Sequence, residues 1–374
     1  MIEIREVKSR KDIKTFIEWP VKVLYKDNPY FVPPLYMDEK KMFKPNYVYK
    51  DQSEYISFLA FKDGKVAGRI QAINQQVANQ KWNEKKVRFT RFDSIDDQEV
   101  ANALFDECCK WAKEKGLDTI VGPLGFSDLE REGLLVEGFD QLSTFEEQYN
   151  YPYYQKLVEN YGFVKEVGWT ERQLRAPEVV DEKLERLSSL MMRRYHLHFG
   201  ESKNAKDFIK KYGDAFFEIL DETYEDIYGT VPFTKAMKKM MIDNFKLIID
   251  TRFVAVILDE NNKVVCFGLC FPSIAKAAQK AKGHLYLHHL PTFLKAIKHP
   301  KVIDLGLIGV LPEYKMRGIA SAIIHQTMLM LQNPEIEYAE TNLNLEDNNS
   351  IQNQWKSFDN VLHKRRYAYK KTIE

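Results

Sequence analysis

Residues 310–320 combine side chains suited to holding a phosphate, and they read V-L-P-E-Y-K-M-R-G-I-A. Pro312 ends the apolar run before them, because proline has no backbone donor for a sheet. Isoleucines at helical spacing follow, so the two cations Lys315 and Arg317 and the glycine Gly318 stand at the start of a predicted helix. Such a turn offers unbonded N–H groups and partial positive charge. We therefore predict a phosphate cradle formed by Lys315, Met316, Arg317, Gly318, Ile319, Ala320 and Ser321.

This stretch resembles the pyrophosphate-binding motif of the GNAT acyltransferases, written Q/R-x-x-G-x-G/A. Lys315 stands at its first position, Gly318 at its fourth and Ala320 at its sixth. Lysine departs from the family pattern but keeps the positive charge. The resemblance implies an acyl-coenzyme A co-substrate, with acetyl-coenzyme A as the expected donor, and no metal. It also implies that backbone groups of Ile308, Gly309 and Val310 orient the thioester and the pantetheine arm.

The 374 residues exceed what one hydrophobic core usually serves, so two domains are expected. Two similar hairpins contain Phe58 and Phe253, and two short helices follow Asn150 and Asn348. The separations, 195 and 198 positions, are nearly equal, which indicates an internal duplication. We predict an α/β fold with a mixed sheet, built from two tandem GNAT-like domains.

The predicted domains are residues 1–177 and 178–374, and only the second has the cofactor motif. In the first, residues 93–97 read D-S-I-D-D where a phosphate turn would lie. Three acids would repel a pyrophosphate, so we expect a degenerate domain without cofactor. Residues 191–199 are interpreted as the opening strand of the second domain. Several short sequence runs, among them G-L-L-V-E-G-F-D, resemble those of a group of uncharacterised bacterial proteins with tandem GNAT-like domains.

Acyl transfer to an amine needs a base for the ammonium and sometimes an acid for the thiolate. Glu340, on the strand after the cradle helix, is the first base candidate, and Asp304 is the second. Asn348 matches the asparagine of the family's last motif and is expected near the cofactor. Trp355 stands where the family has its tyrosine acid, and indole cannot deliver a proton. Tyr367 or Tyr369 is the remaining candidate acid.

The acceptor is predicted to lie between the first two helices of the second domain and the cleft facing the first domain. Tyr228 and Phe233 fall on that helix–helix loop and are predicted to contact it, and Pro232 lies between them. The acidic run 128–132 could attract a cationic amine, although such runs are usually solvated. The resemblance thus implies an amine-bearing small molecule or peptide as the partner.

A net charge of +1 gives no bulk field for nucleic acid or an anionic membrane, so neither is an expected partner. No apolar run approaches the roughly 20 residues of a membrane span. The four cysteines lack metal-ligand spacing and indicate a reduced, cytoplasmic protein. His284, His288 and His289 lack a spaced carboxylate or thiol, so we do not expect a metal there. A monomer is expected, with a dimer as the alternative.

Three functions remain open at this point. The leading one is an acyl-coenzyme A N-acyltransferase, with acetyl as the expected acyl group. The second is a non-catalytic coenzyme A-binding sensor or scaffold, in which Trp355 reflects lost turnover. The third is a tRNA-dependent aminoacyl transferase, for which the only basic run is His363-Lys364-Arg365-Arg366.

Overall fold

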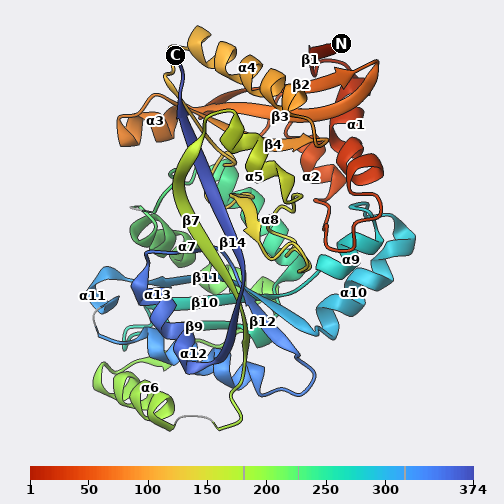
Figure 1. Ribbon diagram of the computed structural model, residues 1–374. Helices are drawn as coiled ribbons and strands as arrows, with labels where there is room; N and C mark the ends of the chain where they lie inside the picture. Colours follow the sequence, from red (N-terminus) through yellow and green to blue (C-terminus); the bar gives the residue numbers. More distant parts are fainter. Residues whose placement is uncertain (180–181, 226, 316) are drawn as a thin grey trace. The chain divides into compact units, whose positions relative to one another are not determined.

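The computed structural model describes residues 1–179, 182–225, 227–315 and 317–374 (Figure 1). The chain forms two compact units. Unit 1 comprises residues 1–170, 275–290 and 363–374, and unit 2 comprises residues 171–274 and 291–362. These compact units are discontinuous in sequence. They are therefore not the duplicated halves predicted to meet at residue 177, and that division stays a prediction. No helix of the described residues has the length and hydropathy needed to cross a bilayer.

Unit 1 is a mixed sheet in the order β1-β2-β3-β4-β5-β14, with β6 paired to β14. Its strands are β1 (Ile2–Glu6), β2 (Ser53–Lys62), β3 (Lys65–Gln75), β4 (Lys86–Ser94), β5 (Thr119–Gly122) and β6 (Leu134–Glu137). Its helices are α1 (Arg10–Trp19), π-helix η1 (Pro20–Leu24), α2 (Tyr36–Lys41), α3 (Gln76–Trp82), α4 (Gln98–Glu114), α5 (Tyr153–Asn160) and α9 (Ala275–Lys280), with the 3₁₀ turn η3 (Leu287–His289).

Local sequence signals account for much of unit 1. Ser9 and Asp12 form the capping box that begins α1. The Asp63-Gly64 turn joins β2 to β3, and both residues have positive φ. The core packs the α4 side chains Leu104 and Phe105 against the sheet and α5. The predicted hairpin that contains Phe58 is therefore confirmed.

The strand order in unit 2 is β7-β12-β11-β10-β9-β8, with β13 paired to β7. Its strands are β8 (His198–Phe199), β9 (Val254–Leu258), β10 (Val264–Pro272), β11 (Val302–Val310), β12 (Tyr338–Thr341) and β13 (Asn344–Leu345). Strands β7 (Val164–Arg175) and β14 (Asp359–Thr372) each run from one unit into the other. Its longer helices are α6 (Glu182–Arg194), α7 (Ala205–Thr223), α8 (Lys235–Ile248) and α12 (Ala320–Leu331).

Shorter elements complete the chain: α11 (Pro312–Lys315), α13 (Asn349–Gln354), and the 3₁₀ turns η2 (Thr251–Phe253) and η4 (Trp355–Ser357). Helix α10 (Leu290–Lys298) begins at the last residue of the 275–290 segment. Each unit contains one parallel strand pair joined through a helix, β4-α4-β5 in unit 1 and β11-α12-β12 in unit 2. This repeated topology agrees with the internal duplication expected from the sequence.

One element was predicted wrongly. Residues 191–194, interpreted as the start of a strand, belong to helix α6. The inward positions Leu184, Ser188 and Met191 recur at helical spacing, but a serine among them and the basic residues that follow obscure the period. Only His198 and Phe199 form the expected strand, β8.

Candidate functional site

The site is organised by two parallel strands of unit 2, of which β12 pairs along its whole length with the first part of the longer β11. β11 and β12 are in register from Val302 and Tyr338 to Leu305 and Thr341, where the pairing ends. β11 continues to Val310 and remains paired on its other side with β10. The Thr341 hydroxyl accepts a hydrogen bond from the backbone N–H of Arg172 (2.8 Å) and so fixes the end of β12. One edge of β11 therefore opens beyond Leu305.

Backbone groups at two predicted positions face this open edge. The Leu311 N–H donates to the Val265 carbonyl (3.0 Å), and antiparallel pairs alternate between bonded and non-bonded. Ile308 and Val310 are consequently non-bonded positions, whose N–H and C=O groups point away from β10. Gly309, between them, points its backbone groups at β10 instead. These directions suit the predicted role of Ile308 and Val310 in orienting an extended ligand.

The Tyr224 hydroxyl donates to the Ile308 carbonyl (3.2 Å) and so lies at the same open edge. Tyr224 caps the C-terminus of α7. Tyr224 is not among the predicted site residues, because it stands at the end of the apolar period of α7, where core packing is the usual role. One signal was available in the sequence. The last apolar position of the α7 period is a tyrosine, whose hydroxyl is not needed for core packing.

A bulge shapes β11 just after the pairing with β12 ends. Leu305 and Leu307 oppose Cys270 and Leu269, so Gly306 is the extra residue. A Cβ at Gly306 would lie 2.5 Å from the Phe271 ring and 2.8 Å from the Leu269 carbonyl oxygen. Glycine is therefore required here by packing, and the bulge redirects the residues that follow it.

The predicted phosphate cradle lies between β11 and α12. Gly318 has φ +73°, a left-handed conformation that side chains rarely adopt, and it is exposed. The Ser321 N–H and hydroxyl both bond to the Gly318 carbonyl (3.0 and 2.7 Å), which closes the first turn of α12. Ile319 is buried and Ala320 is half-buried, so both hold the turn against the unit. Met316 was predicted in this cradle and lies outside the described residues.

Both predicted cations of the cradle are exposed. The Arg317 guanidinium lies 4.8 Å from the Tyr314 ring and 5.0 Å from the Tyr195 ring. Such cation–π contacts restrict the arginine without neutralising its charge. Lys315 ends α11. The turn thus keeps two positive charges next to the N-terminus of a 12-residue helix.

The two base candidates are neighbours on one face of the sheet. Asp304 and Glu340 are register partners, and their side chains are 7% and 4% exposed. Asp304 is also opposite Phe271, whose ring stacks on Phe245 of α8 at 5.4 Å. The alternate residues of these strands join the core cluster that contains α12 side chains. The carboxylates therefore lie on the α8 face, next to the point where β11 and β12 separate.

Four other predicted residues have the following environments. The Asn348 side chain accepts from the Ile351 N–H (3.3 Å) and caps α13. Trp355 is buried in the core of unit 2, and its indole N–H donates to Asn344 (2.8 Å). Tyr228 and Phe233 lie on the α7–α8 loop as predicted, with the Phe233 ring 5.7 Å from that of Phe217. The roles assigned to these residues stay predictions, and Trp355 behaves as a packing residue.

The candidate acid Tyr367 lies in unit 1, whereas Glu340 and Asp304 lie in unit 2. Its ring faces the Lys165 ammonium at 3.9 Å, and its backbone pairs with Leu134 of β6. Tyr369 is buried in the core of unit 1, and its hydroxyl donates to Glu159 (3.2 Å). Neither tyrosine belongs to the unit that holds the cradle.

In unit 1 a carboxylate occupies the helix start that corresponds to the cradle. The Asp97 side chain accepts from the N–H groups of Glu99 (3.0 Å) and Val100 (3.3 Å) at the start of α4. Lys62 pairs with the same carboxylate. Because an anionic side chain already fills this site, the geometry favours the expectation that unit 1 binds no pyrophosphate.

The acidic run 128–132 is folded into unit 1 and is not a solvated surface run. The Glu130 carboxylate accepts from the Tyr47 hydroxyl (3.0 Å) and from the Phe126 N–H (3.2 Å). Glu132 is 4% exposed, and its Oε1 has no hydrogen-bond partner among the described residues. Burial, reinforced by the nearby Asp128 carboxylate, raises the pKa of Glu132 well above its usual value.

This raised pKa predicts that Glu132→Gln stabilises the protein above neutral pH. A carboxyl whose pKa is higher in the folded than in the unfolded state contributes its full stabilisation below its unfolded pKa of about 4.3. This stabilisation is lost as the pH rises through the folded-state pKa. Calorimetry should show a Tm increase of roughly 2–8 °C at pH 8 and little change at pH 4. The exposed Glu114→Gln serves as the control and should change Tm at neither pH. An equal shift at both pH values would contradict the titration argument.

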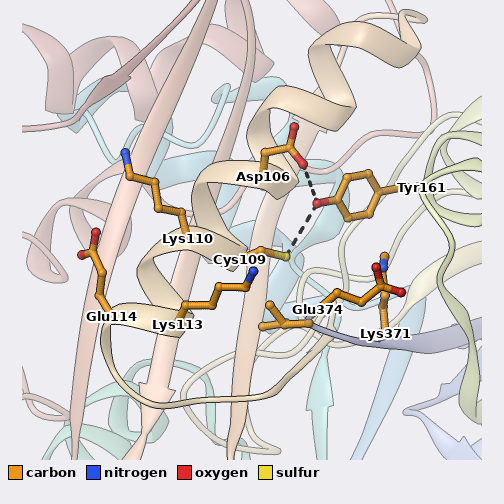
Figure 2. Close-up of a pocket in the computed structure, with 9 residues that line it drawn as sticks. Asp106, Cys109, Lys110, Lys113, Glu114, Tyr161, Lys371 and Glu374 are labelled. Atoms are coloured by element: carbon orange, nitrogen blue, oxygen red, sulfur yellow. Dashed lines mark hydrogen bonds between the residues drawn. The ribbon is translucent and has the colours of Figure 1, made fainter.

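Figure 2 shows a surface pocket of about 480 Å³ in unit 1. The Tyr161 hydroxyl donates to Asp106 (2.7 Å) and lies 3.7 Å from the Cys109 sulfur. Burial raises the pKa of the Cys109 thiol, which therefore stays protonated and is a weak nucleophile. None of the predicted site residues lines this pocket. Among the described residues, no group of three or more His, Cys, Asp or Glu is placed to hold a metal ion.

Solved structures identify the architecture. A tandem GNAT protein from the clavulanic acid biosynthesis pathway, solved without AcCoA, aligns with 100% of this chain and 99% of its own, at a TM-score of 0.57 and 11% identity. A GCN5-related N-acetyltransferase from Sphaerobacter thermophilus aligns with 100% of this chain and 96% of its own, at a TM-score of 0.51 and 11% identity. The chain therefore has the tandem GNAT fold, as the sequence predicted.

Two curated proteins are similar in sequence. Protein YghO of Escherichia coli is 25% identical over 380 residues, which cover 99% of this chain and 95% of that protein. The bacterial ceramide synthase of Caulobacter vibrioides is 26% identical over 338 residues, which cover 86% of this chain and 79% of that protein. No family model matches the chain.

Proposed function

We propose that this chain, which has the tandem GNAT fold, is an acyl-coenzyme A-dependent N-acyltransferase whose second half binds the donor. The observation that carries the proposal is the conjunction, in unit 2, of the open edge of β11 and the Gly318 turn at the start of α12. The edge supplies extended backbone for a pantetheine arm, and the turn supplies N–H groups and two cations for a pyrophosphate. The first half has a scaffolding role.

The proposed residues fit the donor without rearrangement of the strands. Ile308 and Val310 direct backbone groups to the open edge and are half-buried, so an extended ligand can reach them. A Cβ added to Gly318 would have Met191 of α6, at 3.9 Å, as its nearest neighbour beyond the adjacent residues of the chain. The cradle is therefore open next to the backbone, as a bound phosphate requires.

The proposed reaction is direct transfer. Glu340 accepts a proton from the ammonium of the acceptor, and the free amine nitrogen attacks the thioester carbonyl carbon. A C–N bond forms, the C–S bond breaks, and the sulfur leaves as thiolate, which takes up the second proton that the nitrogen releases on becoming an amide and so gives the free coenzyme A thiol. A thiol has a pKa near 8.5, so the thiolate leaves without strong acid assistance. Asp304 is the alternative base.

Tyr224 is proposed to supply the proton that Trp355 cannot. Tyr224→Phe removes one hydroxyl at the open edge and leaves the ring, so the fold should be retained with a loss of about 1 kcal/mol of stability from the missing bond to Ile308. We expect kcat to fall by about 10–100-fold at neutral pH, with donor affinity changed less than threefold. Tyr314→Phe, on the cradle side, is the control. An unchanged kcat would limit Tyr224 to a structural role.

A more specific part of the proposal concerns which acyl group is transferred and which molecule accepts it. The GNAT resemblance favours acetyl, and an amine-bearing small molecule or peptide as acceptor. The ceramide synthase relative favours a long acyl chain and an amino lipid, because a ceramide is a fatty amide. A long-chain acyl donor is therefore the second candidate, and both transfers use the same cradle.

Titration calorimetry with coenzyme A, acetyl-coenzyme A and palmitoyl-coenzyme A tests the proposal. We expect micromolar affinity for all three, since they share the pyrophosphate, and a tighter interaction for the acyl group that the site accepts. Release of the coenzyme A thiol with a panel of polyamines, amino sugars, peptides and long-chain amino alcohols then identifies the acceptor. Binding without release for any amine would favour a coenzyme A sensor, and absence of binding would remove the proposal.

A further inference from the structure

The segment that contains α9 and α10, residues 275–301, exposes a run of large apolar side chains. Leu287 is 84% exposed, and Leu285, Tyr286 and Leu290 are each more than two-fifths exposed. Leu294, one helical turn after Leu290 on α10, is 52% exposed. Isolated exposed leucines are ordinary on a protein surface. Five such side chains within ten residues are not isolated, and they indicate an interaction surface.

The base of this segment is firmly attached to unit 1. The Gln279 side chain donates to the carbonyls of Pro29 (2.9 Å) and Phe31 (3.0 Å). The Tyr36 N–H donates to the Gly283 carbonyl (2.9 Å), and a Cβ at Gly283 would lie 2.3 Å from the Pro34 carbonyl oxygen. The alanines of and after α9 are buried. The exposed leucines therefore follow an ordered base and do not belong to a loose loop.

Aromatic rings form a row along the exposed part. The His284 ring stacks on Tyr36 at 4.9 Å and on Tyr286 at 5.0 Å, and Tyr286 stacks on His288 at 5.7 Å. Rings with a polar edge favour the boundary between water and lipid, where one end is wet and the other apolar. The row thus adds a second feature of interfacial segments to the exposed leucines.

The charge of the segment has a single sign. Residues 275–301 contain six lysines and four of the chain's eight histidines, and no aspartate or glutamate. Glu18 of unit 1, whose charge acts on His284, is itself paired with Lys22 at 2.7 Å. The chain's net charge of +1 hides this concentration. An anionic surface is the complementary partner.

The combination selects one class of partner. The cores of protein–protein interfaces are depleted of lysine, whereas here lysines flank the exposed leucines on both sides in the sequence. Nucleic acid would match the lysines and leave Leu287 and Leu290 in water. Interfacial membrane segments combine lysine with leucine and tyrosine in this way.

We propose that the α9–α10 segment docks the protein on an anionic phospholipid bilayer surface. Leu285, Leu287 and Leu290 enter the boundary between headgroups and acyl chains, and the lysines of the same unit, Lys276, Lys280 and Lys282, face the phosphates. The inference is independent of the proposed acyltransferase activity, because it rests on the surface of residues 275–301 alone. It departs from the expectation, drawn from the net charge, that no membrane is a partner.

Sedimentation of the full chain with phosphatidylcholine vesicles, with and without phosphatidylglycerol, tests this proposal. We expect binding only to vesicles with phosphatidylglycerol, weakened by added salt. Leu287→Asp should lower the partition constant at least about tenfold, since it removes a leucine that is proposed to enter the bilayer and adds a charge that anionic lipid repels. Leu247→Asp is the matched control, because Leu247 is 71% exposed on α8, outside the segment. It should bind as the unaltered chain does.

Two results would overturn the proposal. One is equal sedimentation of Leu287→Asp and Leu247→Asp with anionic vesicles, or no sedimentation of the unaltered chain. The other is a dimer in analytical ultracentrifugation that Leu287→Asp dissociates, without vesicle binding, which would assign the leucines to a contact between two copies. Coenzyme A titration of the same variants separates this question from the proposed function, since docking variants should keep donor affinity.

Discussion

Gly318→Glu is expected to weaken acyl-coenzyme A binding by at least about 100-fold, or about 2.7 kcal/mol. The substitution puts a carboxylate beside the N-terminus of α12, directly after the two cations that are proposed to meet the pyrophosphate. A side chain at this position also occupies the space next to the backbone that the phosphate needs. Titration calorimetry with acetyl-coenzyme A and with free coenzyme A measures the effect, which should be the same for both ligands.

Because Gly318 has φ +73°, the substitution also strains the backbone, and the control must carry the same strain. Gly64 has φ +76°, is exposed, and a Cβ added there would have nothing within 4 Å. Gly64→Glu therefore costs a similar 1–2 kcal/mol or so in backbone energy but places its charge in the β2–β3 turn of unit 1. It should leave donor affinity unchanged. Equal losses in the two variants would trace the effect to general destabilisation.

The turn before α12 was predictable because its signal is local. A proline that ends a strand, two cations and a glycine before an apolar period are adjacent in sequence, and the structure places Gly318 in the left-handed turn before α12. The capping box at Ser9 and the turn at Asp63-Gly64 were predictable for the same reason. In each case a backbone conformation is dictated by one or two residue types.

Features that depend on distant packing were not predictable. The hydroxyl of Tyr224 is at the open edge because α7 packs beside β11, and helical periodicity alone made Tyr224 a core residue. The compact units are discontinuous because residues 275–290 and 363–374 pack with residues 1–170. The burial of Glu130 and Glu132 likewise depends on tertiary partners such as Tyr47. Local composition had suggested a solvated run there.

The sequence predicted both base candidates, and the structure gives a reason to separate them by experiment. Asp304 and Glu340 are register partners on the same face, so either could reach an acceptor on the α8 side of the sheet. Glu340 stands on the strand whose pairing with β11 ends one residue later, and its longer side chain reaches further from the backbone. We therefore assign the base to Glu340 and expect Asp304 to support its position.

Glu340→Gln is expected to lower kcat by about 10²–10⁴-fold, the usual contribution of a general base. Glutamine has nearly the same size and can still be hydrogen-bonded, so the fold and the donor affinity should be retained. Thiol release with the best acceptor amine measures the rate, and calorimetry checks donor binding. Asp304→Asn should reduce kcat less than about tenfold, and Glu337→Gln, on the exposed residue before β12, should leave it unchanged.

The ranking of these three variants decides the assignment. If Asp304→Asn is the more damaging substitution, the base lies on β11, next to the bulge at Gly306, and the acceptor approaches along that strand. If neither carboxylate affects kcat while donor binding persists, the amine must arrive unprotonated, and the open edge with its Tyr224 hydroxyl would then perform the catalysis without a base from this face. A loss of donor affinity in Glu340→Gln would instead show that this carboxylate shapes the donor site.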